Sequence, residues 1–370
     1  MVLSVATGNG LRKEIKSKII SFGGAVQILN YQPNPVYEQV PVQLGDSLLH
    51  QLRQNPAISH VQAFGQKAGI IKNKDLFEGA VLKGVGPDYQ WDNFKTYLQE
   101  GQLPHYRQKG YNDSIALSSV LAQKLKLALG DTLTMYFIRP NRPPLFRRFT
   151  IAALFKTDFD EIDESFLLGD LNHVKRLNQW DSTQVGGYEI FMQEPDQMNE
   201  LARNLRLLLP FEYDAISARQ LNSQIFQWLD LFDLNILVIL IIIIAVATVN
   251  MSIALLILIM ERTQMIGLLK ALGDTNGSIQ RIFLLNATYL ILKGLAYGNL
   301  IGIGLAFLQK QFGWIKLDSS TYYVSQVSID LNPWHLLGLN AGTVLICLIC
   351  LLLPSFLITR IKPVKALRFD

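Results

Sequence analysis

The sequence predicts an α-helical membrane protein that carries a large α+β domain on one side of the membrane. Three long apolar runs lie within residues 233–370, whereas residues 1–232 resemble a soluble protein in composition. The first run, 233–260, contains no Lys, Arg or Glu. As a helix it would span about 42 Å, which exceeds the roughly 30 Å hydrocarbon core of a bilayer. The chain therefore divides into two unlike halves.

The first half interleaves short strand and helix patterns, which indicates an α+β domain over residues 23–225. A serine is expected to cap the helix at 118–131 and Gly130 to end it, and the Pro-rich turn at 140–144 is expected to join two strands as a hairpin. The expected strands are 25–29, 36–42, 60–72, 76–85, 132–138, 148–157, 165–169 and 187–193. The expected helices are 44–56, 118–131, 170–180 and 195–209.

The N-terminal segment 1–22 allows two interpretations. Leu11, Ile15 and Ile19 form one apolar stripe of a helix that is otherwise rich in basic residues. Such a helix either lies on a membrane surface or forms a stalk that continues a membrane helix. Residues 1–10 have neither the basic region nor the long apolar core of a signal peptide.

The basic residues of the loops predict the orientation of the chain. The segment 261–281 contains three Lys or Arg residues and the tail 359–370 contains four, whereas the loop 309–333 contains two. The positive-inside rule therefore places the segment and the tail in the cytoplasm, and the loop and the α+β domain outside. Membrane helices are expected within 226–260, which includes a stalk, and at 282–308 and 334–358.

An outward domain without a signal peptide requires a membrane helix before it. We therefore expect that the natural reading frame extends upstream of Met1, or that its start was trimmed.

Metal, nucleotide and nucleic-acid sites find little support in the sequence. The GxxxxGK[ST], HExxH and GxSxG motifs are missing, and the five histidines are scattered. The acidic cluster at 158–164 lacks the ligand spacing of a calcium loop, so it reads as a solvated loop. The formal charge of +4 includes no basic tract. No cofactor, metal or nucleic acid is therefore expected on this chain.

Three polar residues stand out inside the apolar runs. Lys293 either faces the helix bundle, where it would be functional, or snorkels to the membrane interface, and the sequence favours neither. Asn250 and Asn286 are expected to form hydrogen bonds between helices.

The segment 261–281 predicts a short helix with an apolar face. Gly273 is expected to end this helix and Ser278 to begin the next. The apolar face either lies on the membrane interface or docks into a groove on a cytoplasmic partner. The residues expected at this contact are Glu261, Met265, Ile266, Leu268, Leu269, Lys270, Leu272 and Gly273.

Several segments resemble the FtsX/MacB-like ABC transporter permeases. The sequence MERTQMIGLLKALGDTNGSIQRIF resembles their coupling-helix segment, and YYVSQVSIDLNPW resembles a loop of the lipoprotein-releasing LolC/LolE branch. FKTDFDEIDESFLLGDLNHVKRL resembles part of the family's extracytoplasmic domain, the MacB-like periplasmic core domain. The start of the chain and its end, LLPSFLITRIKPVKALRFD, are also similar to the family, so the likeness covers nearly the whole chain.

The resemblance implies a permease subunit of an ABC transporter in the inner membrane, which is not itself an enzyme. Such permeases have four membrane helices and a periplasmic domain after the first, which is largely missing here. Two copies or paralogues pair with two ATPase subunits, which bind ATP and magnesium and move the periplasmic domains by mechanotransmission through a stalk. In the lipoprotein-releasing branch, a lipoprotein leaves the inner membrane for the outer membrane and passes to a periplasmic chaperone.

The resemblance also implies two contact regions. The first apolar run is suited to contact acyl chains of the cargo, and equally suited to contact bulk lipid. The hairpin 137–150 corresponds to a chaperone-facing hairpin but is short, so the chain resembles a LolE-like partner or one half of a homodimer. The acyl-chain contacts would be Ile236, Leu237, Leu240, Ile243 and Ile244. The hairpin contacts would be Phe137, Arg139, Arg142 and Phe146.

Three other functions stay open. A MacB-like efflux permease or an FtsX-like activator of cell-wall hydrolases would use the same machinery, although the segment 322–334 favours lipoprotein release. A membrane-anchored binding or signalling module would need no ATPase, and the apolar face of the helix at 261–272 argues against it.

Overall fold

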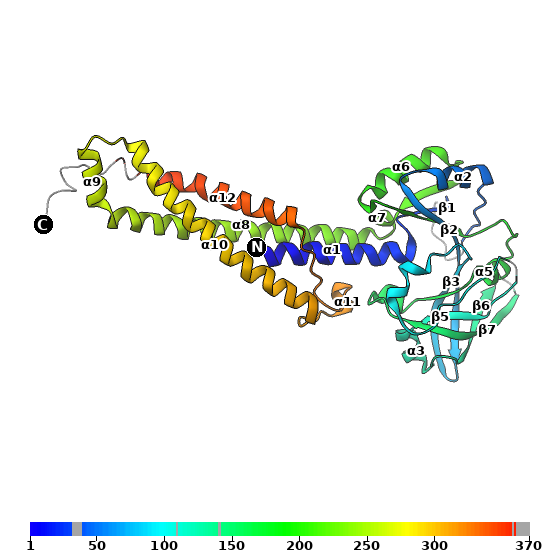
Figure 1. Ribbon diagram of the computed structural model, residues 1–370. Helices are drawn as coiled ribbons and strands as arrows, with labels where there is room; N and C mark the ends of the chain where they lie inside the picture. Colours follow the sequence, from blue (N-terminus) through cyan, green and yellow to red (C-terminus); the bar gives the residue numbers. More distant parts are fainter. Residues whose placement is uncertain (32–38, 109, 140–141, 357–358, 360–370) are drawn as a thin grey trace. The chain divides into compact units, whose positions relative to one another are not determined.

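The computed structural model describes residues 1–31, 39–108, 110–139, 142–356 and 359. The chain forms two compact units, whose elements are drawn in Figure 1. The sheet unit comprises Glu14–Phe226 and Leu317–Ser325. The helical unit comprises Met1–Lys13, Gln227–Lys316 and Gln326–Asp370. The predicted fold class is confirmed, because a large α+β unit accompanies three helices, among the described residues, that are long and apolar enough to cross a membrane.

The sheet unit is built on one mixed sheet. Its strands follow the order β10-β1-β9-β2-β3-β8-β5-β7-β4, and β6 pairs with β2 and β7. The β3–β8 and β5–β7 pairs are parallel, and the other pairs are antiparallel. The strands are β1 (Val26–Asn30), β2 (Ile58–Asn73), β3 (Leu76–Val85), β4 (Leu98–Gly101), β5 (Ser114–Ser118), β6 (Thr132–Arg139), β7 (Arg142–Phe155), β8 (Phe166–Asp170), β9 (Gly187–Met192) and β10 (Tyr213–Ser217).

Short helices connect and cover these strands. They are α2 (Asp46–Gln54), α3 (Ser119–Leu125), α4 (Asp160–Asp163), α5 (Leu171–Asn178), α6 (Met198–Leu208), α7 (Ala218–Leu221) and α11 (Ser319–Tyr322). Three 3-10 turns lie at Trp91–Asn93, Lys95–Tyr97 and Pro195–Gln197. The apolar core forms where α3 and α5 pack on the sheet, and it includes Phe137 of β6 and Phe149 of β7.

Most of the expected strands and helices are present, with two exceptions. The hairpin around the Pro-rich turn is formed by β6 and β7, as expected. The helix expected at 118–131 is shorter: Ser118 caps α3, but Lys126 adopts a left-handed φ of 54° and ends it before Gly130. Residues 36–38 of the strand expected at 36–42 lie outside the described residues. Residues 39–42 form no strand, apart from an isolated bridge between Val42 and Val185, so the expectation is wrong there.

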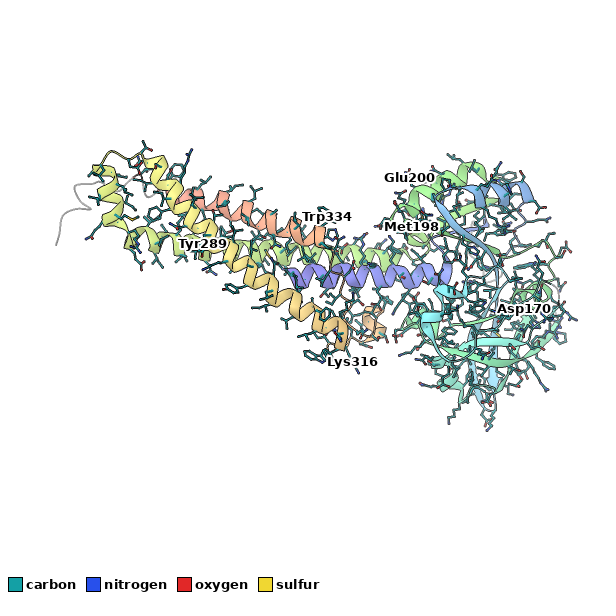
Figure 2. All side chains as sticks on the ribbon, viewed as in Figure 1. Asp170, Met198, Glu200, Tyr289, Lys316 and Trp334 are labelled. Carbon is teal, nitrogen blue, oxygen red and sulfur yellow. The ribbon has the colours of Figure 1, made fainter. Side chains whose placement is uncertain are left out.

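The helical unit contains the long helices of the described chain and the short helix α9. They are α1 (Val2–Gly23), α8 (Ser223–Glu261), α9 (Thr263–Ala271), α10 (Asn276–Phe312) and α12 (Pro333–Ser355), and α1 and α8 each contribute residues to both units. The stripe of Leu11, Ile15 and Ile19 on α1 is buried within the protein, which favours a stalk over a helix on a membrane surface. Trp334 is exposed in the first turn of α12 (Figure 2).

A buried ion pair marks the junction of α1 with the sheet. Lys83 of β3 and Glu189 of β9 are at most 1% exposed, and Lys83 Nζ lies 2.6 Å from Glu189 Oε1. Lys83 Nζ also donates to the carbonyl of Phe22 in the last turn of α1 and lies 4.2 Å from the centre of the Phe22 ring. Gln62 Nε2 donates to Glu189 Oε2 at 2.8 Å. Burial lowers the pKa of Lys83 below its usual value, and Glu189 opposes this shift.

Removing Lys83 should destabilise the protein strongly. Lys83→Met leaves Glu189 charged and buried without a cation, which typically costs about 3–5 kcal/mol of unfolding free energy. The melting temperature of the full chain in detergent should fall clearly, and adding Glu189→Gln should restore part of it. Lys95→Met is the control, because the Lys95–Asp92 pair is exposed and contributes at most about 1 kcal/mol. Equal melting temperatures for Lys83→Met and Lys95→Met would contradict the role of the buried pair.

Candidate functional site

The connection between α8 and α10 forms a compact helical turn. Thr263 at the start of α9 donates through Oγ1 to the carbonyls of Ile259 and Met260, at 3.1 and 2.8 Å. Gly273 ends α9 with a φ of 97°, as expected for a residue after a helix. The cap of α10 is Thr275, whose Oγ1 accepts from the backbone N–H of Ser278 at 3.3 Å. The expectation that Ser278 begins this helix is therefore wrong, because the helix already includes Ser278.

The apolar residues of α9 point in two directions. Ile266 is fully buried and packs with residues of α8, α10 and α12, and Leu269 packs against the same cluster. In contrast, Met265, Leu268 and Leu272 are 39%, 53% and 77% exposed. The single apolar face expected from the sequence is thus divided into a buried anchor and an exposed patch. Ile266 is corrected from a partner contact to a core residue, because the neighbouring helices already cover it.

The polar members of the same segment lie at its edges. Glu261 is exposed at the end of α8, and Gly273 is exposed after α9. Lys270 is half-buried in the last turn of α9, and burial lowers the pKa of its ammonium group. Glu261 and Gly273 are therefore exposed at the two ends of the α9 segment, whereas Lys270 is partly buried on the helix.

The residues proposed for acyl-chain contact lie on two faces of α8. Ile236, Leu240 and Ile244 are half-buried on one stripe, whereas Leu237 and Ile243 are exposed. A Cβ atom built on Gly8 of α1 would lie 2.2 Å from Ile236 Cδ1, so α1 and α8 pack closely there. Ile236 therefore meets α1, and Leu237 and Ile243 remain open to lipid or to another chain.

The polar residues inside the membrane helices have different environments. Asn299 of α10 donates to Asn340 of α12 at 3.1 Å, which is an interhelical hydrogen bond. Asn250 and Asn286, for which such bonds were expected, are exposed on this chain. Lys293 is also exposed, and its ammonium lies 4.7 Å from the centre of the ring of Tyr289, which is labelled on α10 in Figure 2. Lys293 therefore does not face the bundle formed by this chain.

Fewer of the expected contact residues of the β6–β7 hairpin are exposed than the sequence suggested. Phe137 is fully buried in the core of the sheet unit, so its assignment to a chaperone-facing surface is corrected. Arg139 folds back and donates to the carbonyl of Pro143 at 2.8 Å. Phe146 is 53% exposed and its ring lies beside that of Tyr136. The side chain of Arg142 lies outside the described residues.

Sequence reasoning missed two polar contacts. The Lys83–Glu189 pair and the Asn299–Asn340 bond each join residues of different elements. Alternation along β3 gave no signal for Lys83, because Lys83 shares a face with the exposed Phe77 and both faces of the strand become buried only at its end. Among the described residues, no cluster of His, Cys, Asp or Glu is arranged to hold a metal ion.

Two protein families match this chain. Residues 1–206 match the MacB-like periplasmic core domain, and residues 237–363 match the FtsX-like permease C-terminal domain. The first match covers more than half of the chain. The chain belongs to the FtsX/MacB-like permease family. Permeases of this kind are membrane subunits of ABC transporters.

Two relatives of this permease align with it over nearly the whole length of both chains. The lipoprotein-releasing system transmembrane protein LolC of Xylella fastidiosa is 20% identical, covering 100% of this chain and 90% of that protein. The corresponding protein LolE of Haemophilus influenzae is 21% identical, covering 99% of this chain and 90% of that protein. The macrolide export ATP-binding/permease protein MacB of Chlorobaculum tepidum is 31% identical over 30% of this chain and 15% of that protein.

The division of α9 predicts opposite effects of two truncations. Ile266→Ala removes buried contacts and should cost about 2–5 kcal/mol of unfolding free energy, whereas Leu268→Ala should change it by no more than about 0.5 kcal/mol. Melting temperatures of the full permease in detergent measure both effects. A larger loss for Leu268→Ala than for Ile266→Ala would show that α9 is anchored through its other face.

Proposed function

We propose that this permease belongs to an ABC transporter of the lipoprotein-releasing type. It couples ATP hydrolysis by a partner subunit to extraction of lipoproteins from the inner membrane toward the outer membrane. The observation that carries this proposal is the full-length likeness to LolC and LolE, which includes both the sheet unit and the membrane helices. The segment YYVSQVSIDLNPW supports the same branch.

The proposed orientation follows from charge. The segment that contains α9 carries more Lys and Arg than the loop between α10 and α12, so α9 and the C-terminus face the cytoplasm. The sheet unit then faces the periplasm, in agreement with its match to a MacB-like periplasmic domain. A multi-pass inner-membrane protein results from this orientation.

The proposed ATPase contact is the exposed patch of α9. Met265, Leu268 and Leu272 are exposed apolar residues that lie three and four positions apart, on one face of the helix. An amphipathic helix that places such residues in a groove of a partner is a common mode of recognition. Ile266 and Leu269 pack α9 against the neighbouring helices, so the exposed patch lies on a helix that is held in place. ATP and magnesium bind to that partner in this proposal.

The proposed cargo and pairing contacts lie elsewhere on the chain. Leu237 and Ile243 of α8 are open to the acyl chains of a lipoprotein, and the same surfaces suit a second permease copy or paralogue. Phe146 is the remaining exposed aromatic residue for a chaperone contact at the β6–β7 hairpin. An efflux role like that of MacB is the alternative within the family.

The α9 patch can be tested by a charge substitution. Leu268→Asp places a carboxylate in the apolar contact and should weaken binding of the ATPase subunit by about 2 kcal/mol or more, which is roughly thirtyfold. The ATPase that co-purifies with the full permease measures this loss. Leu207→Asp on α6 is the matched control, because Leu207 is 86% exposed on the sheet unit. Undiminished co-purification with Leu268→Asp would contradict the proposed contact.

The cargo can be tested by depletion in cells. When the permease is depleted, lipoproteins destined for the outer membrane should accumulate in the inner membrane, because their extraction stops. Fractionation of the two membranes with acylated reporters measures this shift, and expression of the wild-type permease should reverse it. Normal sorting after depletion, together with loss of export of another compound, would favour the efflux alternative.

A further inference from the structure

The connection between α10 and α12 is a folded hairpin whose tip belongs to the sheet unit. We call residues 317–325 the docking loop. Their contacts place them in the sheet unit, whereas the flanking residues Lys316 and Gln326 belong to the helical unit. Lys316 is labelled in Figure 2. The chain thus enters the sheet unit and leaves it again within one short loop.

A buried glutamine holds the base of this hairpin within the helical unit. Gln309 near the end of α10 is 7% exposed. Its Oε1 accepts from Ile315 N at 3.0 Å, and its Nε2 donates to the carbonyls of Ile315 and Val327, at 3.2 and 3.3 Å. Val327 N also donates to Ile315 O at 3.1 Å. One side chain therefore fixes both arms of the hairpin to α10.

The docking loop is held in the sheet unit by contacts of three kinds. The ring of Tyr323 stacks on that of Phe159, with centroids 5.2 Å apart. Ser325 Oγ donates to Asp158 Oδ2 at 2.9 Å, and Lys18 Nζ donates to Tyr323 O at 3.4 Å. Val324, between them, is fully buried. The loop is therefore a packed part of the sheet unit.

The turn at 157–163, which contacts the docking loop, also has hydrogen bonds of its own. Asp163 is 1% exposed and accepts from Thr157 N, Thr157 Oγ1 and Asp158 N, at 2.9, 2.8 and 3.0 Å. Lys156 Nζ lies 2.8 Å from Asp158 Oδ1. Burial opposes ionisation of Asp158, but Lys156 and Ser325 together hold the pKa of its carboxyl below the usual value. An ionised acceptor thus faces Ser325, and hydrogen bonds to charged groups are the stronger ones.

Unusual backbone conformations occur on both sides of the contact. Asp158 and Tyr323 have φ angles of 55° and 59°, in the left-handed region that residues with side chains seldom adopt. Each costs about 1 kcal/mol or more and persists only where surrounding contacts enforce it. The stacked ring of Tyr323 and the bound carboxylate of Asp158 supply such contacts. The two segments therefore depend on one another for their conformations.

We propose that the docking loop couples α10 and α12 to the sheet unit, with Asp158, Phe159 and Lys18 as the positioning residues that hold it. In this arrangement α1 and α8 are not the sole links between the membrane helices and the sheet unit. A displacement of the end of α10 is transmitted through Gln309 to both arms of the hairpin. The tip of the hairpin transmits it to the turn at 157–163. The proposal rests on these contacts and not on the identity of the cargo.

The test is hydrogen exchange of the full chain in lipid nanodiscs. Gln309→Leu removes the three hydrogen bonds at the base of the hairpin, in the helical unit. If the loop couples the two units, exchange at residues 157–163 should become about tenfold faster, as expected when local opening becomes easier by about one hydrogen bond. Gln280→Leu is the matched control, because Gln280 of α10 binds Ser355 O outside the hairpin, and it should leave 157–163 unchanged.

A charge substitution at the tip tests the same contact from the other side. Ser325→Asp places a second carboxylate against Asp158 and should speed exchange at both 317–325 and 157–163. Adding Asp158→Asn should restore slow exchange, because the amide donates to the new carboxylate and Asn tolerates a left-handed φ.

The proposal is overturned if Gln309→Leu loosens 313–327 while 157–163 exchanges as in the wild type, or if Asp158→Asn gives no rescue. Gln309→Glu keeps the acceptor for Ile315 and loses both donated bonds, so it replaces the leucine variant if that variant does not fold. The measurement needs neither an ATPase nor a lipoprotein. Its failure is therefore distinct from failure of the proposed transport function.

Discussion

The position of α1 in the sheet unit depends on the buried pair of Lys83 and Glu189. The carbonyl of Phe22 lies at the negative end of the α1 dipole, and Lys83 reaches it from β3 while its charge is balanced by Glu189 on β9. Because neither charge reaches solvent, a shift of α1 along its axis would leave buried polar groups without partners. One polar cluster in apolar surroundings thus defines where the helix ends against the sheet.

A buried anchor also lies beside a contact residue at α9 and at the docking loop. Ile266 fixes α9 on its neighbours and leaves Leu268 and Leu272 exposed, and Gln309 fixes the hairpin whose tip binds Asp158. A transporter that works through mechanical linkage needs parts that keep their relative geometry while force passes through them. In this account, Ile266 and Gln309 hold the backbone near each proposed contact. A displacement of one element would then move the contact and not only reorient a side chain.

The sequence was most informative where structure depends on local pattern. Apolar runs predicted the three long helices. Strand-like runs predicted β2 and β3, and the Pro-rich turn between two such runs predicted the β6–β7 hairpin, because each pattern lies within one segment. It was least informative where the outcome depends on which segments meet. The burial of Phe137 and Ile266 follows from neighbours distant in sequence, and so do the Asn299–Asn340 bond and the docking of Tyr323 on Phe159. For the candidate site, the sequence located α9 but did not separate its anchoring residues from its exposed ones.

We propose that this permease and a partner ATPase use ATP to extract lipoproteins. To test this, the permease is reconstituted with its co-purified ATPase in liposomes that hold an acylated lipoprotein. A soluble lipoprotein chaperone is then added, and the released lipoprotein is measured. We predict that lipoprotein appears in the soluble fraction with ATP and magnesium, and stays in the liposomes with a non-hydrolysable analogue. Equal release in both conditions, or hydrolysis of ATP without any release, would contradict the claim.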